Sequence, residues 1–203
     1  MRLFVAVPIA PAVRDAVAAA LAPVRAAHPG VRWTQPDGWH LTLAFLGEVA
    51  APGPAIDAVG PVAAAHPAAR LTLGDPGRFA DRVLWLAVHD HPAGELIDLA
   101  ADVGAGLVDA GLLAPDDPAV SRPLRAHLTL ARKRRQPIDD PLVAAVRAAL
   151  DGAGAHVTAS WPSRRVELWR SQLGQGPARY EVIASFATVA GADAAASEGA
   201  GEG

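Results

Sequence analysis

The sequence predicts an α+β protein built on antiparallel sheets, with a duplicated site. Strand-like segments mostly occur in pairs flanked by helical segments, whereas a parallel sheet would need a regular alternation of strand and helix. The pentapeptide His-Leu-Thr-Leu-Ala occurs at residues 40–44 and again at residues 127–131. Each copy lies on a predicted strand that follows a predicted helix. The repeat therefore indicates two related lobes, each offering half of a site across a cleft.

The elements of the first half are predicted from hydrophobic patterning and from the positions of proline and glycine. The first helix begins with a proline in its first turn, and turn residues at 80–81 connect the strands of a hairpin. In order, the expected elements are a strand at Arg2–Val7, a helix at Pro11–Ala27, a strand at Trp39–Leu46, a helix at Pro54–Ala65, hairpin strands at Arg70–Phe79 and Arg82–His89, and a helix at Pro92–Gly111.

The second half begins with a loop rich in proline and aspartate, residues 113–123. Asp140 is the expected N-cap of the last helix, because a proline follows it. From Gly191 onward the composition cannot form a core, so residues 191–203 are expected to be a disordered tail on a single domain of residues 1–190. The other expected elements are a strand at Leu124–Ala131, a helix at Asp140–Leu150, and strands at His156–Ser160, Arg164–Ser171 and Tyr180–Val189.

The composition is that of a soluble intracellular protein. Apolar residues make up 51% of the 203 residues, which is enough for a sizeable core, and there is no cysteine. The apolar start of the chain is too short for a signal peptide and is broken by Pro8 and Pro11. No segment approaches the ~20 apolar residues of a membrane span. We expect a cytoplasmic protein and a monomer.

Positive charge is concentrated around the second copy of the pentapeptide. The net charge of −3 argues against a general nucleic-acid binder. Residues 120–180 nevertheless carry 11 basic and 4 acidic side chains, whereas residues 1–119 carry 7 basic and 13 acidic ones. This region could hold a polyanion. For the run from Lys133 to Arg135, a merely solvated basic surface is an equal alternative.

Each copy of the pentapeptide has a polar face and an apolar face. Residues i and i+2 of a strand lie on the same side, so the histidine and threonine share one face. The leucines, together with Phe45, are expected on the other face, in the core. The polar faces would present His40 and Thr42 from one strand, and His127 and Thr129 from the other.

Paired imidazoles and hydroxyls are suited to acid–base chemistry on a phosphate ester. The ordinary pKa of histidine lies near neutrality, so one ring can be protonated while the other is neutral. The neutral ring accepts a proton from water, and the charged ring donates one to the leaving oxygen. Threonine hydroxyls can donate hydrogen bonds to the non-bridging oxygens. Arg132, two residues beyond Leu130, could add a charge-assisted contact.

Other kinds of site are less well supported. No Asp, Glu or second His stands at metal-ligand spacing beside either copy. The segment from His89 to His91 has ligand-type residues but is expected to be a loop. There is no P-loop or dinucleotide-binding fingerprint. The remaining histidines, His28, His66 and His156, are expected at the surface. Three tryptophans could stack on a base but are expected in the core: Trp39, Trp161 and Trp169.

The chain resembles the 2H phosphoesterases, which are defined by two His-x-Thr/Ser motifs. Within them it is most similar to the bacterial RNA 2′,3′-cyclic phosphodiesterases, also called 2′-5′ RNA ligases. The resemblance covers about residues 2–189 and rests on the segments 2–8, 39–48, 122–132, 166–171 and 176–180. One departure is Ala126, because family members often have proline before the second histidine.

The resemblance implies a bilobal α+β fold, with two antiparallel sheets and flanking helices around a central cleft, related by a pseudo-two-fold duplication. It implies hydrolysis of an RNA terminal 2′,3′-cyclic phosphate to a 2′-phosphomonoester, and in some members the reverse joining of RNA ends. His40 would be the proton donor and His127 the proton acceptor, with Thr42, Thr129 and Arg132 binding the phosphate. Neither a metal nor a cofactor is implied. Two alternatives are a 2H enzyme acting on small cyclic phosphates of nucleotides or ADP-ribose, and a non-catalytic RNA-end binder.

Overall fold

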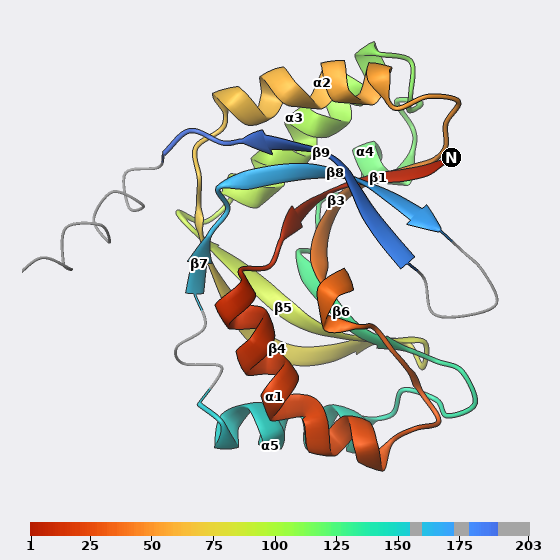
Figure 1. The fold of residues 1–203 in the computed structure, drawn as a ribbon, viewed down its shortest axis with the longest axis vertical. Helices are drawn as coiled ribbons and strands as arrows, with labels where there is room; N and C mark the ends of the chain where they lie inside the picture. Colours follow the sequence, from red (N-terminus) through yellow and green to blue (C-terminus); the bar gives the residue numbers. More distant parts are fainter. Residues whose placement is uncertain (155–159, 173–178, 191–203) are drawn as a thin grey trace, which may run out of the picture.

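The computed structural model describes residues 1–154, 160–172 and 179–190, so the expected tail and residues 156–159 lie outside the described residues. Helices and strands alternate irregularly along the chain, as the α+β prediction requires (Figure 1). The elements are β1 (Arg2–Pro8), α1 (Pro11–Ala27), β2 (Arg32–Trp33), the 3₁₀ turn η1 (Pro36–Gly38), β3 (His40–Glu48), α2 (Gly53–Ala65), β4 (Arg70–Phe79), β5 (Val83–His91), α3 (Glu95–Asp109), α4 (Pro118–Ser121), β6 (His127–Arg132), α5 (Asp140–Gly152), β7 (Ser160–Pro162), β8 (Arg165–Gln172) and β9 (Arg179–Ala187).

The strands of the described residues form one nine-stranded antiparallel sheet. The sheet consists of two halves that meet at a single pair of residues. The order β7-β4-β5-β6 forms one half and β3-β1-β8-β9 the other, with β2 paired to β6. The halves are joined where Leu41 of β3 pairs with Leu128 of β6. Since β3 and β6 pair only there, the two halves diverge on either side. This divergence opens the space between the lobes.

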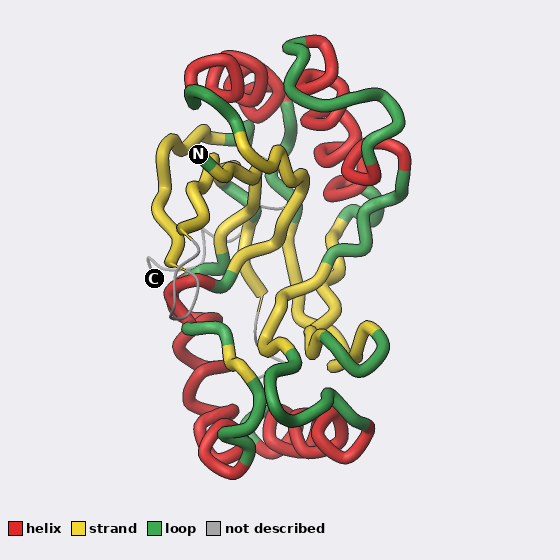
Figure 2. The backbone as a smooth tube through the Cα atoms, turned by 90° about the vertical axis from the view of Figure 1, so that its right-hand side faces the viewer, coloured by secondary structure: helices red, strands yellow, loops and turns green. Residues whose placement is uncertain are grey.

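The helices cover the two halves separately. α2 and α3 pack on each other and on the half that contains β3, β8 and β9. α1 and α5 pack on each other, and α5 lies against β4 of the other half. Figure 1 shows the two helix pairs at opposite ends of the molecule, and Figure 2 shows the strands between them. The predicted bilobal α+β class is therefore confirmed.

Local capping interactions explain where the structure departs from the expected helix boundaries. α3 begins at Glu95 and not at Pro92, because the Asp90 carboxylate accepts hydrogen bonds from the backbone N–H groups of Gly94 and Leu96, at 3.1 and 2.8 Å. The segment 113–123 was expected to be a loop but contains α4. Its first turn is capped by Asp117, which accepts from the N–H of Ala119 at 2.8 Å.

The N-cap of α5 is Asp139, and the prediction of Asp140 is wrong by one residue. Asp139 Oδ1 accepts a hydrogen bond from the N–H of Leu142 at 3.1 Å, while Asp140 pairs with Arg78. We expect Asp139→Ala to lower the free energy of unfolding by about 1 kcal/mol, measured by denaturant titration. Asp139→Asn, which can still cap, should change it little. Equal destabilisation by both variants would contradict this role.

The histidines outside the pentapeptides differ from their expected surroundings. His66 is buried, with 8% of its surface exposed, so the expectation of a surface position is wrong. It ends α2 and faces α3, where its Nε2 lies 3.3 Å from Asp102 Oδ2. His89 and His91 belong to β5 and not to a loop, because their backbones pair with β4. His28 is half-buried beside Gln136, and His156 lies outside the described residues.

In the part of the chain that the structure describes, no helix is both long enough and apolar enough to cross a membrane.

Candidate active site

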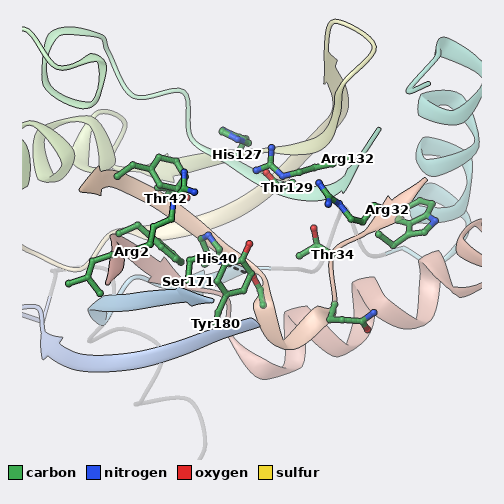
Figure 3. A pocket seen from close by; sticks show the side chains of 16 residues that line it. Arg2, Arg32, Thr34, His40, Thr42, His127, Thr129, Arg132, Ser171 and Tyr180 are labelled. Atoms are coloured by element: carbon green, nitrogen blue, oxygen red, sulfur yellow. Dashed lines mark hydrogen bonds between the residues drawn. The ribbon is translucent and has the colours of Figure 1, made fainter. Parts of the chain in front are cut away.

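The two pentapeptides meet across the junction of the lobes. Equivalent leucines, Leu41 and Leu128, pair with each other on antiparallel strands, so a pseudo-two-fold axis passes between them. Each of these leucines lies between the histidine and the threonine of its own copy, so their pairing brings all four residues to the junction. Both histidines and both threonines line one cleft of about 600 Å³ (Figure 3). The structure thus brings together the four residues that the sequence singled out.

A β-bulge occurs at the same position in both copies. In β3 the bulged residue is Leu43, because Val5 and Ala6 of β1 pair with Ala44 and Thr42. In β6 it is the equivalent Leu130, because successive residues of β5 pair with 131 and 129. The side chains at positions 40–45 and 127–132 consequently show the same alternation of partly buried, buried and exposed. An extra residue shifts the alternation of a strand by one position.

The bulges decide which residues join the polar face. Strict alternation would place Phe45 with the leucines, and it would place Arg132 on the equivalent core face. Instead Phe45 is 56% exposed and lines the cleft, so its predicted place in the core is wrong. Arg132 is exposed and lines the cleft, as the proposed phosphate contact requires.

Both histidine rings are fixed by a hydrogen bond to the backbone two residues earlier. His40 Nδ1 lies 2.8 Å from the carbonyl oxygen of Gly38, and His127 Nδ1 lies 2.6 Å from that of Arg125. A carbonyl only accepts, so each Nδ1 carries the hydrogen and donates it. The tautomer with a free Nε2 is thereby selected on both rings. Nε2 is then the atom available to take up or release a proton.

Aromatic rings surround both imidazoles. His40 contacts Phe4, Trp169 and Tyr180, with ring centroids at 4.6, 5.3 and 5.3 Å. His127 meets the edge of Phe79 at 5.1 Å. The pKa of His40 is lowered to about 4, chiefly by burial; the Gly38 carbonyl opposes this shift, and the positive charges of Arg132 and His127 contribute to it.

The pKa of His127 is also lowered from its ordinary value, chiefly by burial. Nearby Arg132 and Arg125 act in the same direction, while the carbonyl oxygen of Arg125 opposes them. Both imidazoles are therefore biased toward the neutral state by their protein surroundings. A bound anion would oppose this bias, because a neighbouring negative charge favours the protonated ring.

The cleft is positively charged. Three arginines, Arg2, Arg32 and Arg132, line it, and no acidic residue of the described part of the chain does. Within the described residues, none of the three forms an ion pair, whereas peripheral arginines do, as in Arg14–Asp15 and Arg170–Glu181. Unpaired guanidinium groups around two imidazoles are suited to an anionic substrate.

Several cleft residues were not singled out from the sequence. They are Arg32 and Thr34 near β2, Arg2 at the start of β1, and Ser171 and Tyr180 on β8 and β9 (Figure 3). Arg2, Ser171 and Tyr180 lie within segments that carry the family resemblance, which was the one available signal for them. Of the basic run after Arg132, Lys133 pairs with Asp81, and none of Lys133, Arg134 and Arg135 lines the cleft.

The tryptophans are placed as expected for a core, and one of them also supports the site. Trp39 and Trp161 are 3% exposed, and Trp169 is 6% exposed while packing against His40.

Among residues 1–154, 160–172 and 179–190, no three His, Cys, Asp or Glu side chains are grouped so that they could hold a metal ion.

Comparison with known proteins assigns the chain to a family. Residues 13–175 match the family model of the 2′-5′ RNA ligase superfamily. The chain belongs to the 2′-5′ RNA ligase superfamily. A superfamily relative described as RNA 2′,3′-cyclic phosphodiesterase, from Geobacillus stearothermophilus, is 28% identical over 206 residues, which cover 98% of this chain and 61% of that protein. The chain thus spans less than two thirds of that relative's length.

Solved structures agree with this membership of the superfamily. The crystal structure of TT0787 from Thermus thermophilus aligns with a TM-score of 0.70 and 27% identity, covering 94% of this chain and 99% of that one. Escherichia coli LigT, crystallised with 3′-AMP, aligns with a TM-score of 0.66 and 26% identity, covering 93% and 98%. The fold is therefore that of superfamily members along nearly the whole described chain.

Proposed function

We propose that the protein hydrolyses the 2′,3′-cyclic phosphate at the end of an RNA to a 2′-phosphomonoester, without a metal ion. The observation that carries this proposal is the pair of Nδ1-fixed histidines whose free Nε2 atoms are available in one positively charged cleft. The relative described as an RNA 2′,3′-cyclic phosphodiesterase supports the choice of reaction. The 3′-AMP complex of LigT supports a ribonucleotide in the cleft.

The reaction needs one proton acceptor and one proton donor. His127 Nε2 takes a proton from water as the water oxygen bonds to phosphorus. The bond from phosphorus to O3′ breaks, and His40 Nε2 gives its proton to O3′, which leaves as a hydroxyl. The phosphate remains attached to O2′. His40 has to be protonated beforehand, and the bound phosphate anion raises its pKa from the low value that the protein surroundings alone give.

The threonines and Arg132 bind the phosphate. The hydroxyls of Thr42 and Thr129 donate hydrogen bonds to the non-bridging oxygens, where negative charge accumulates. The Arg132 guanidinium adds a charge-assisted contact. If the 5′-hydroxyl of a second RNA replaces water, the same groups form a 2′-5′ linkage, which accounts for reversible ligation.

Single-turnover cleavage of a short RNA ending in a 2′,3′-cyclic phosphate tests the proposal. With EDTA present, we expect full activity and a product carrying only a 2′-phosphate, separated from the 3′ isomer by chromatography. Loss of activity that added metal restores would overturn the metal-free mechanism. A 3′-phosphate product would reverse the assignment of the leaving oxygen. No turnover would favour the alternatives of a small cyclic nucleotide or binding alone.

A further inference from the structure

The short strand β2 places an arginine directly opposite a cleft arginine. Arg32 of β2 pairs in register with Arg132 of β6, and Trp33 pairs with Ala131. Both arginines line the cleft, together with Thr34 just beyond β2. Figure 3 shows the three side chains at one end of the cleft and Arg2 at the other, with the histidines between. Positive charge thus lies on both sides of the histidines, with the opposed pair Arg32 and Arg132 on the β2 side and Arg2 alone on the other side.

β2 is held rigidly although it is only two residues long. The backbone N–H of Thr34 donates to the carbonyl oxygen of Leu130 at 2.9 Å. The Thr34 carbonyl accepts from Arg25 Nη1 at 3.0 Å, and the Arg25 guanidinium stacks over the Trp33 ring. The Trp33 indole N–H donates to the carbonyl of His28 at 3.0 Å. These contacts hold the backbone that carries Arg32 and Thr34 on one side of the strand.

The pairing of Arg32 with Arg132 is unfavourable unless an anion lies between them. Like charges directly opposite each other on neighbouring strands are destabilising. No acidic residue among those described neutralises either guanidinium, and both side chains are exposed to the cleft. An opposing pair of unneutralised arginines at the end of a catalytic cleft has the chemistry of a phosphate site.

We infer that Arg32 and Thr34, with Arg132 shared, bind the phosphodiester that precedes the cyclic phosphate. This inference rests on the proposed function. The cyclic phosphate lies between the histidines, and the next phosphate lies toward β2, bound by the Arg32 guanidinium and the Thr34 hydroxyl. The site therefore selects oligonucleotides over nucleoside cyclic phosphates, because only an oligonucleotide has the second phosphate.

The test compares uridine 2′,3′-cyclic phosphate with the dinucleotide UpU ending in a 2′,3′-cyclic phosphate. We expect kcat/KM of the wild type to be about tenfold or more higher for the dinucleotide, as one charge-assisted hydrogen-bonded contact would give. Arg32→Gln should remove most of this preference through KM, so that the dinucleotide reaction loses about tenfold more than the mononucleotide reaction. Arg135→Gln, which removes a charge outside the cleft, is the matched control and should change neither reaction.

A dinucleotide with an uncharged methylphosphonate linkage tests the same contact by removing the charge from the substrate and not from the protein. On this substrate the wild type and Arg32→Gln should be equal, because the contact that the variant removes is absent from both. An equal loss on both natural substrates would place Arg32 at the cyclic phosphate and overturn the inference. No loss on either, or a wild type without preference for the dinucleotide, would overturn it as well.

Binding of the products separates failure of the inference from failure of the proposed function. A wild type that hydrolyses neither substrate would refute the proposed function. Calorimetric affinities for UpU 2′-phosphate and uridine 2′-phosphate would still show whether the second phosphate is bound. Dependence of that affinity difference on Arg32 is the expected result, and equal affinities would refute the subsite.

Discussion

Replacing either His40 or His127 with alanine should lower the single-turnover rate roughly 10²–10⁴-fold, the range in which a positioned acid or base contributes. In the proposed mechanism each ring supplies one proton transfer through Nε2, because Nδ1 is occupied by a backbone carbonyl. Asparagine variants should lose as much, because an amide cannot exchange the proton. His91→Asn, at an exposed position at the end of β5, should retain full activity.

A substrate with sulfur in place of the 3′ oxygen assigns the two roles separately. A thiolate leaves without needing a proton, so this substrate should restore most of the rate of the His40 variant and little of that of the His127 variant. The melting temperature of each variant is the control for folding. It is needed because His40 packs against Phe4 and Trp169, so its replacement could also destabilise the protein. Rescue of the His127 variant alone would exchange the two assignments.

The second large effect is on pH dependence: kcat/KM should be highest between about pH 4 and pH 6.5. This parameter reports the free enzyme, in which burial lowers the pKa of His40 to about 4 and lowers that of His127 from its ordinary value near 6.5. In the proposed mechanism the active form has His40 protonated and His127 neutral. Above both pKa values its population falls about tenfold per pH unit, so kcat/KM at pH 8 should be at least about tenfold below its maximum.

The profile of kcat should lie at higher pH than that of kcat/KM, because the bound phosphate anion raises the pKa of both rings. Coincident profiles, or a kcat/KM that is flat from pH 5 to pH 8, would contradict this.

The acid limb of the kcat/KM profile requires a parallel measurement of folding by circular dichroism. Since the folded pKa of His40 lies below its unfolded value, unfolding takes up a proton and stability falls as the pH drops from 6.5 toward 4.

Hydrophobic patterning was enough to predict most of the fold. The bounds of α1 agree with its prediction at both ends, because a proline opens the helix and His28-Pro29 ends it. β2 was missed because two residues are too few to show any periodicity, and its pairing with β6 depends on the junction of the lobes. α4 was missed because its four residues lie in a segment rich in proline and aspartate.

The candidate site could be predicted as far as strand alternation holds. His40, Thr42, His127 and Thr129 precede the bulges, so their common face followed directly from the sequence. Phe45 follows a bulge, and nothing in the sequence signals that a leucine is skipped in the pairing with the neighbouring strand. The pKa of the imidazoles was likewise beyond sequence reasoning, because it depends on rings brought from distant strands, as Trp169 is to His40.

The matching bulges also bear on regioselectivity. A site with true two-fold symmetry would accept a cyclic phosphate in either of two orientations, with O2′ and O3′ exchanged, and would yield two isomers. The equivalent positions aimed into the cleft are Phe45 in one copy and Arg132 in the other. An aromatic ring and a guanidinium favour different parts of a nucleotide, so the two orientations differ in energy. In the proposed mechanism the duplication supplies matched acid and base groups, and divergence at this position adds to the differences between the two sides of the cleft that give the substrate a direction.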